Sequence, residues 1–256
     1  RNNIMSTINI VGTGGIIEGN LGAPDVDVNL DSALYFSGDS SDSVSDHVTM
    51  GDNDLITTGS FTLSAWIRPL TNTTHGATII GKQQTYNTNA LGYGLYWRAS
   101  TNAVYFNIGD GSNGDQLLSG DLSGHVDSWI HIAGTYNASS KAMVLYVNGV
   151  SVDTGTASGA GDLSASNSHH LRLGANGTDP DEGDAHFKGY IADARIYTYL
   201  HDQPAVARLA AKINVIDPHA DSNYGLVGWW KCNDGSGSNI VDHHNVGTDF
   251  DGTFKR

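Results

Sequence analysis

The sequence predicts an all-β fold, a two-sheet antiparallel β-sandwich with one short helix in its C-terminal part. Apolar and polar residues alternate with the strand period of two, as along residues 61–67 (FTLSAWI), and Gly, Asn and Asp separate such runs. Only Glu18 and Glu182 of the 27 acidic residues are Glu, and 32 of the 256 residues are Gly. Because helices favour Glu and disfavour Gly, a mainly helical fold is disfavoured.

Further strands are expected wherever this alternation recurs between turn residues. These segments are residues 77–81, 93–98, 103–108, 129–136, 143–152, 171–173 and 190–197. Asn148 and Gly149 tolerate the positive φ of a type I′ turn, so they predict a hairpin between two strands. The helix is expected over residues 203–212, where Pro204 suits the first turn and the apolar residues that follow share one face.

The charge balance argues against two classes of partner. The chain has 13 Lys and Arg residues against 27 Asp and Glu residues, which gives a formal net charge of −14. Nucleic acids and anionic lipids attract proteins of the opposite sign, so we expect neither as a partner. No apolar run approaches the roughly 20 residues of a membrane span, so no membrane insertion is expected. Cys232 is the only cysteine, which leaves no internal disulfide and no Cys-based zinc site.

Nine segments occur in an order that resembles a laminin-G-like, or concanavalin A-like lectin/glucanase, jelly roll. They are residues 32–38 (SALYFSG), 47–50 (HVTM), 59–67 (GSFTLSAWI), 79–82 (IIGK), 93–96 (YGLY), 128–136 (SWIHIAGTY), 145–149 (LYVNG), 171–174 (LRLG) and 187–197 (FKGYIADARIY). The resemblance covers about residues 32–213 and implies a jelly-roll sandwich. It does not by itself imply an activity, because this fold hosts lectins, glycosidases and scaffolds.

The two ends of the chain resemble parts of one opening segment of such a module. Residues 225–254, which begin GLVGWWK, look like the first strand region, although they follow the closing helix. We therefore expect a laminin-G-like domain at residues 1–213, a linker at 214–224 and a C-terminal extension at 225–256. In this arrangement the first strand of the module is the last strand of the chain.

Three arrangements of this extension are open. It could be the unattached start of a next module in a tandem array. It could close on its own chain, since an extended linker spans roughly 30–35 Å. It could also be a donor strand that inserts into a neighbouring subunit, which is the leading hypothesis, with Leu226, Val227, Trp229 and Trp230 as anchors.

Donor-strand exchange has a defined consequence for assembly. A head-to-tail contact is heterologous and does not close, so copies of the chain would form a filament. The leading functional hypothesis is thus a non-catalytic extracellular structural subunit whose partners are copies of itself. The alternative is a carbohydrate-binding, lectin-like adhesion module whose partners are glycans.

Catalysis is not expected. Resemblance to the glycosidases of this fold implies paired Glu residues in an E-x-D-x-E arrangement, because an acid and a nucleophile must flank the scissile bond. Neither Glu18 nor Glu182 has a Glu neighbour. Ser236 stands between two glycines, but no strand precedes it and no helix follows it, as a nucleophile elbow would require.

Calcium is the one cofactor with a candidate donor set, because Ca²⁺ takes clustered carboxylates. Resemblance to the family places a calcium site after residues 36–38, but the related carboxylate on the last strand falls at Ala192, and this departure removes one ligand. The alternative is a solvated acidic loop. The candidate ligands are Asp179, Asp181 and Asp184 in the densest acidic cluster, with Asp39 and Asp46.

Exposed loop aromatics could form a platform for a sugar, and Tyr86, Tyr93 and Trp97 are the candidates, although Trp97 also suits the core of a sandwich. Three glycosylation sequons begin at Asn72, Asn137 and Asn176. The sequons favour a location outside the cell or on a cell or virion surface.

Overall fold

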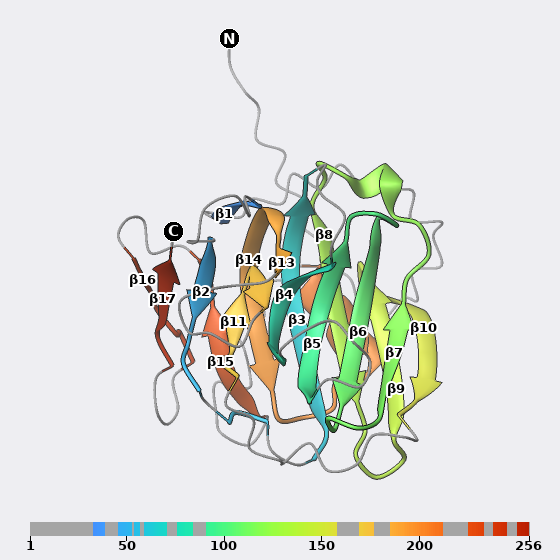
Figure 1. Ribbon diagram of the computed structural model, residues 1–256. Coiled ribbons are helices and arrows are strands. Elements are labelled where there is room, and N and C mark those ends of the chain that lie inside the picture. The colour runs from blue at the N-terminus through green and yellow to red at the C-terminus, as the bar shows by residue number, and fades with distance from the viewer. Residues whose placement is uncertain are drawn as a thin grey trace, which may run out of the picture.

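The chain folds into two antiparallel β-sheets that face each other across one apolar core (Figure 1). The computed structural model describes residues 33–38, 46–52, 54–56, 59–70, 76–83, 91–157, 169–176, 185–211, 225–232, 238–244 and 250–255. This arrangement confirms the predicted all-β sandwich.

Among the described residues, one sheet has seven strands and the other has eight. The first contains, in order, β1 (Leu34–Ser37), β14 (Lys188–Tyr197), β3 (Phe61–Pro69), β8 (Ile130–Tyr136), β9 (Ala142–Val147) and β10 (Val150–Thr156), and β15 (Leu226–Trp230) also pairs with β14. The second contains β16 (Asn239–Ile240), β17 (Gly252–Lys255), β2 (His47–Thr49), β11 (Arg172–Leu173), β4 (Gly76–Gln83), β5 (Gly92–Arg98), β6 (Ala103–Gly109) and β7 (Gly114–Leu118). A small ladder joins β12 (Ala175–Asn176) and β13 (Ala185–His186), and a 3-10 turn η1 (Ser123–His125) precedes β8.

The alternation in the sequence decides which side chains enter the core. Phe61, Leu63 and Ile67 of β3 are fully buried and face the opposite sheet. Gly134 on β8 leaves room for the Phe106 ring, since an added Cβ would lie 2.6 Å from it. A side chain at position 134 would therefore push the two sheets apart.

Two local predictions are confirmed. β9 and β10 meet at a tight turn in which Asn148 and Gly149 both have positive φ, at 50° and 78°. The helix α1 spans Gln203–Ala210, two residues shorter than predicted, and Asp202 caps it by accepting a hydrogen bond from the Ala205 backbone N–H at 2.9 Å. No helix in the described part of the chain is long and apolar enough to cross a membrane.

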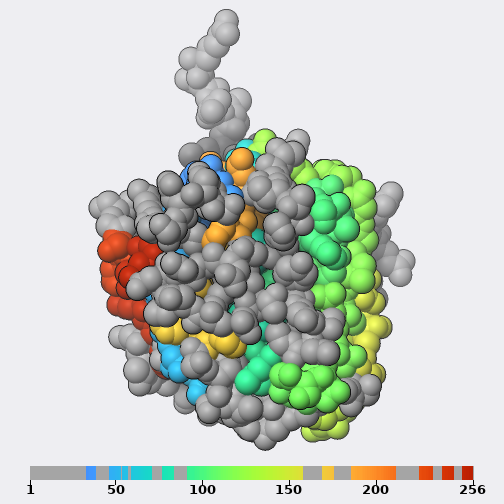
Figure 2. Space-filling model, viewed as in Figure 1, coloured from blue at the N-terminus to red at the C-terminus, as the bar shows by residue number. Residues whose placement is uncertain are grey.

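The C-terminal extension closes on its own chain. β15 pairs with residues 194–197 of β14, and β1 pairs with residues 188–191 on the same edge of that strand. The first and last described strands of the seven-stranded sheet therefore fill one edge together. β17 pairs in turn with β2, so the extension contributes to both sheets, and the red segment lies against the sandwich in Figure 2.

This arrangement differs from the leading prediction of donor-strand exchange and agrees with the self-closure alternative. Leu226, Trp229 and Trp230 pair with β14 of the same chain, on the length of that strand's edge that β1 does not cover. Val227 packs against the core. The predicted linker at residues 214–224 lies outside the described residues.

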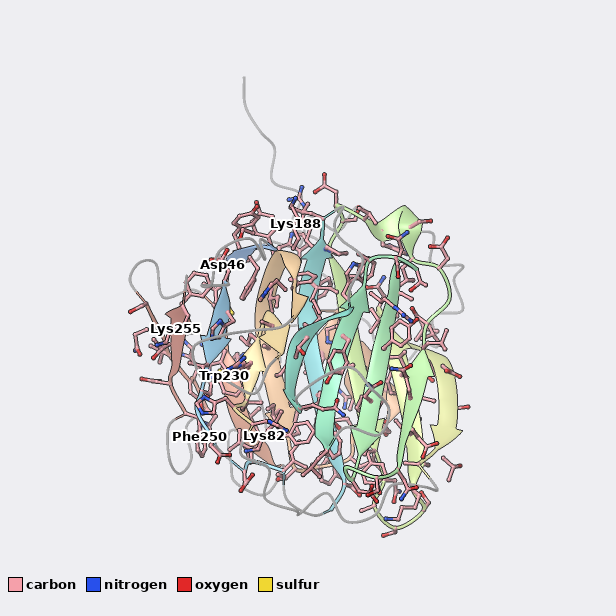
Figure 3. All side chains as sticks on the ribbon, viewed as in Figure 1. Asp46, Lys82, Lys188, Trp230, Phe250 and Lys255 are labelled. Atoms are coloured by element: carbon pink, nitrogen blue, oxygen red, sulfur yellow. The ribbon has the colours of Figure 1, made fainter. Side chains whose placement is uncertain are left out.

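Asp242 fastens this extension. Its carboxylate accepts hydrogen bonds from the backbone N–H groups of Trp229, His244 and Phe250 at 2.8, 3.1 and 3.1 Å. The Trp230 ring N–H donates to the Phe250 carbonyl at 3.0 Å, and both residues lie on the left side of the molecule in Figure 3. One buried acid therefore joins β15 to the segment that leads into β17.

Candidate functional site

The aromatic residues predicted to bind sugar are not at the surface. Tyr93 and Trp97 are 2 and 3% exposed and belong to the main core, so neither ring can contact a ligand. The reason is the alternation of β5, which turns Tyr93, Leu95 and Trp97 inward and leaves Tyr96 on the outer face. Burial, together with the nearby Asp54, raises the pKa of the Tyr93 hydroxyl. Tyr86 lies outside the described residues.

The predicted calcium ligands do not come together in the described part of the chain. Asp39, Asp179, Asp181 and Asp184 lie outside it, and Asp46 accepts a hydrogen bond from the Ser37 backbone N–H at 2.8 Å. Among the described residues no three His, Cys, Asp or Glu side chains are placed to hold a metal ion. Ala192, where the family resemblance implies a carboxylate, is fully buried. Four of the five predicted ligands lie outside the described residues, so calcium stays a prediction for the acidic loops.

The sequons remain untested as glycosylation sites. Asn137 lies in the turn between β8 and β9, where its side-chain oxygen accepts hydrogen bonds from the backbone N–H groups of Ser139 and Ser140 at 2.9 and 3.1 Å. Asn176 belongs to β12, and Asn72 lies outside the described residues.

The outer face of the seven-stranded sheet carries a row of three aromatic side chains and one arginine, which we call the aromatic row: Tyr35, Tyr190, Arg68 and Trp129. Tyr35 of β1 lies opposite Tyr190 of β14, and Tyr190 lies opposite Arg68 of β3. Ile67 pairs with Ile130 of β8, so the same register brings Trp129 beside Arg68. Three neighbouring strands and the residue that precedes β8 therefore each contribute one side chain to a row across the sheet.

The rings of the aromatic row lie close enough to form one surface. The Tyr35 and Tyr190 ring centroids are 5.1 Å apart, and those of Tyr190 and Trp129 are 6.3 Å apart. Tyr35 is 45% exposed, and Tyr190 and Trp129 are half-buried. Beside Arg68 and Tyr190 on the same face of the sheet, Trp66 and Ala192 form a buried cluster against which Trp129 packs. Trp129 is thus supported on one side by buried apolar residues.

An ion pair holds the polar member of the aromatic row in place. Arg68 donates from Nε to the Asp127 carboxylate at 2.9 Å and to its backbone carbonyl at 3.1 Å, and its terminal nitrogen lies 2.7 Å from the same carboxylate. The guanidinium carbon stands 5.7 Å from the Tyr190 ring centroid. The Asp127 N–H donates to the Pro69 carbonyl at 2.7 Å, which ties the loop before β8 to the end of β3. The geometry is therefore fixed by backbone as well as side-chain bonds.

This surface combines the two features of a site for an amphipathic ligand. Aromatic faces supply apolar contact, while Arg68 and Asp127 supply hydrogen-bond donors and acceptors at the rim. Their side chains are 38 and 62% exposed. Lys188 lies two residues before Tyr190 at the start of β14 and is labelled in Figure 3.

The outer face of the eight-stranded sheet is a weaker candidate. It carries Tyr96, Gln83 and Asn107, but all three are buried, at 1, 3 and 0% exposed. The Tyr96 hydroxyl donates to the Gln83 side chain, and its burial raises the pKa of that hydroxyl. In the described structure these polar groups are therefore too buried for a ligand to contact.

Two facing antiparallel sheets with a common core are the architecture of a jelly-roll β-sandwich. The chain belongs to the concanavalin A-like lectin/glucanases superfamily, because the laminin-G-type family model matches residues 42–207. A comparison with curated proteins finds no match.

Solved structures share the fold at low sequence identity. A candidate carbohydrate-binding protein of Bacteroides ovatus superposes with a TM-score of 0.61 at 18% identity over 87% of this chain, which spans 57% of that protein. The CBM40 module of the Ruminococcus gnavus IT-sialidase, bound to α2,3-sialyllactose, gives 0.56 at 13% identity over 70% of this chain and 96% of the module. An SAP-like pentraxin of Limulus polyphemus gives 0.50 at 16% identity, over 70% of this chain and 81% of that one. At these identities the likeness establishes the fold.

Proposed function

We propose that this protein is a non-catalytic carbohydrate-binding module that acts outside the cell or on a cell or virion surface. The observation that carries the proposal is the aromatic row, because it combines partly exposed aromatic rings with polar groups at its rim. Membership of a lectin and glucanase superfamily supports it, as do the Bacteroides ovatus and Ruminococcus gnavus neighbours with their carbohydrate-related descriptions. Nothing in the described structure or in the comparisons supports filament assembly.

Glycan-array binding tests this function. We expect the parent protein to bind a defined set of glycans, and we expect Trp129→Ala and Tyr35→Ala to weaken that binding about tenfold or more, because each removes one ring of the platform. Tyr199→Ala is the matched control, since this tyrosine is 50% exposed and follows the far end of β14. It should bind as the parent does. Circular dichroism shows whether each variant is folded. Equal binding by all three folded variants would remove the aromatic row as the site.

Chelation separates the aromatic row from the acidic loops. The row contains one carboxylate, Asp127, which Arg68 already engages, so it has no cluster of ligands for Ca²⁺. We therefore expect glycan binding to be unchanged when EDTA is added. Loss of binding that returns with added CaCl₂ would instead assign the site to the predicted ligands Asp179, Asp181 and Asp184.

A further inference from the structure

The length of the aromatic row restricts what it can hold. Neighbouring strands lie about 4.8 Å apart, so β1, β14, β3 and the residue before β8 place these side chains in a row across the sheet. The Tyr35 and Tyr190 centroids, on adjacent strands, are 5.1 Å apart, and the Tyr190 and Trp129 centroids, on either side of β3, are only 6.3 Å apart, so these two rings lean towards each other within the row. A single sugar ring covers only part of this line, whereas consecutive rings of a chain can each contact one aromatic face. The geometry therefore favours an extended ligand that crosses the strands.

The charges restrict the ligand further. A sugar carboxylate is best bound by the two parallel N–H groups of an arginine. In Arg68 both Nε and a terminal nitrogen are committed to Asp127, so this fork is already occupied. The Asp127 carboxylate is 62% exposed at the rim and repels an incoming anion while it accepts hydroxyl groups.

Lys188 and the net charge of the whole chain also affect which ligands can bind. Lys188 is a single flexible point charge on the same face as Tyr190. The whole chain has a formal net charge of −14, which opposes the approach of anions. Neutral, hydroxyl-rich sugars are not repelled by this charge and do not need the arginine fork that Asp127 occupies.

Building on the proposed glycan-binding function, we propose that the aromatic row binds a neutral, linear oligosaccharide that lies across β1, β14, β3 and the start of β8. The sugar faces stack on Tyr35, Tyr190 and Trp129, and hydroxyl groups bond to Arg68 and Asp127. This ligand class differs from the acidic trisaccharide held by the Ruminococcus gnavus module.

Titration calorimetry with neutral oligomers of increasing length tests the extended geometry. The probes are cello-, xylo-, manno- and chito-oligosaccharides of one to four units. For the preferred series we expect affinity to rise about tenfold or more from one unit to three and then to level off. Tyr35→Ala removes the end of the row and leaves two aromatic rings, so its affinity should level off at two units instead of three. Tyr199→Ala should keep the full gain.

Paired neutral and acidic ligands test the charge argument. Lactose and 3′-sialyllactose differ by one acidic sugar, and we expect the acidic member to bind no better than the neutral one at low and high salt. Tighter, salt-sensitive binding of 3′-sialyllactose would overturn the inference, and so would a monosaccharide that binds as tightly as its trimer. Either result would leave glycan binding itself in place. Absence of binding to every probe and to the glycan array would instead overturn the proposed function and this inference together.

Discussion

Trp230→Ala should lower the free energy of unfolding by about 3–5 kcal/mol, the usual cost of removing a large buried aromatic side chain. Trp230 is fully buried in the main core and its ring N–H bonds to the Phe250 carbonyl. Gly228 leaves space for this ring, since an added Cβ would lie 2.4 Å from it. The variant therefore loses core contacts and one link between β15 and the rest of the extension. Equilibrium denaturation by urea measures the change.

Trp229→Ala is the matched control because it removes the same side chain from the opposite face of β15. The Trp229 ring is half-buried. Its centroid lies 4.4 Å from the Arg195 guanidinium carbon and 4.3 Å from the Lys231 amine nitrogen, and its ring N–H donates to the Asp193 carboxylate at 2.6 Å. Burial alone would lower the pKa of Arg195, but Asp193 and Tyr197 hold it above its ordinary value, so the guanidinium stays charged. Losing these contacts should cost about 1–2 kcal/mol.

The relative size of the two losses identifies which tryptophan enters the core. A loss for Trp229→Ala equal to or larger than that for Trp230→Ala would contradict the orientation of β15. Both losses should also be independent of protein concentration, since the strand pairs within its own chain. A midpoint of unfolding that rises with concentration would bring back exchange between subunits.

The fold could be predicted from local patterns because these patterns determine local structure. Alternation along residues 61–67 describes a strand with one buried face, and Asn148-Gly149 describes a tight turn, whatever the rest of the chain does. The closing of the extension could be foreseen only as one of several alternatives. The resemblance of residues 225–254 to an opening strand carries no information on whether they pair with their own chain or with a neighbouring one.

The aromatic row could not be predicted because it exists only through strand register. Tyr35, Arg68, Trp129 and Tyr190 are far apart in the chain, and pairing of four strands brings them into line. A signal did exist in each strand, since Tyr35 precedes the core residue Phe36 and Trp129 precedes the core residue Ile130. The choice of Tyr93 as a sugar-binding residue failed for the same reason, and Trp97 lies in the core as its alternative interpretation expected, because alternation identifies two faces and only the packed sheets show which one is inside.

The second large effect concerns His131, whose burial should make the stability of the protein depend on pH. Its ring is 1% exposed and stands 5.6 Å from the ring of Trp66. Burial, together with the positive charge of Arg195, lowers the pKa of His131 from 6.5 to about 3. The folded protein therefore keeps this imidazole neutral under conditions in which the unfolded chain protonates it.

The sign follows from this difference in proton binding. Between pH 6.5 and about 3 the unfolded state binds one more proton at His131 than the folded state does, so stability falls as the pH falls. Two pH units below 6.5, at about pH 4.5, the loss from this one group should be about 2.7 kcal/mol. His169 also has a lowered pKa, chiefly through burial and the charge of Lys82, so the parent protein carries more than one such contribution.

A comparison of slopes isolates His131. His131→Phe keeps a buried ring without a titrating group. Any pH-independent change that the substitution makes to the free energy of unfolding cancels when each variant is compared with itself at two pH values. We expect the free energy of unfolding of the parent to fall between pH 7 and pH 4.5 by about 2.7 kcal/mol more than that of His131→Phe, at constant ionic strength. His125→Phe, in the half-exposed η1 turn, should keep the parental slope. Identical slopes for His131→Phe and the parent would mean that the His131 ring takes up its proton without unfolding, and would contradict its burial beside Trp66 and Arg195.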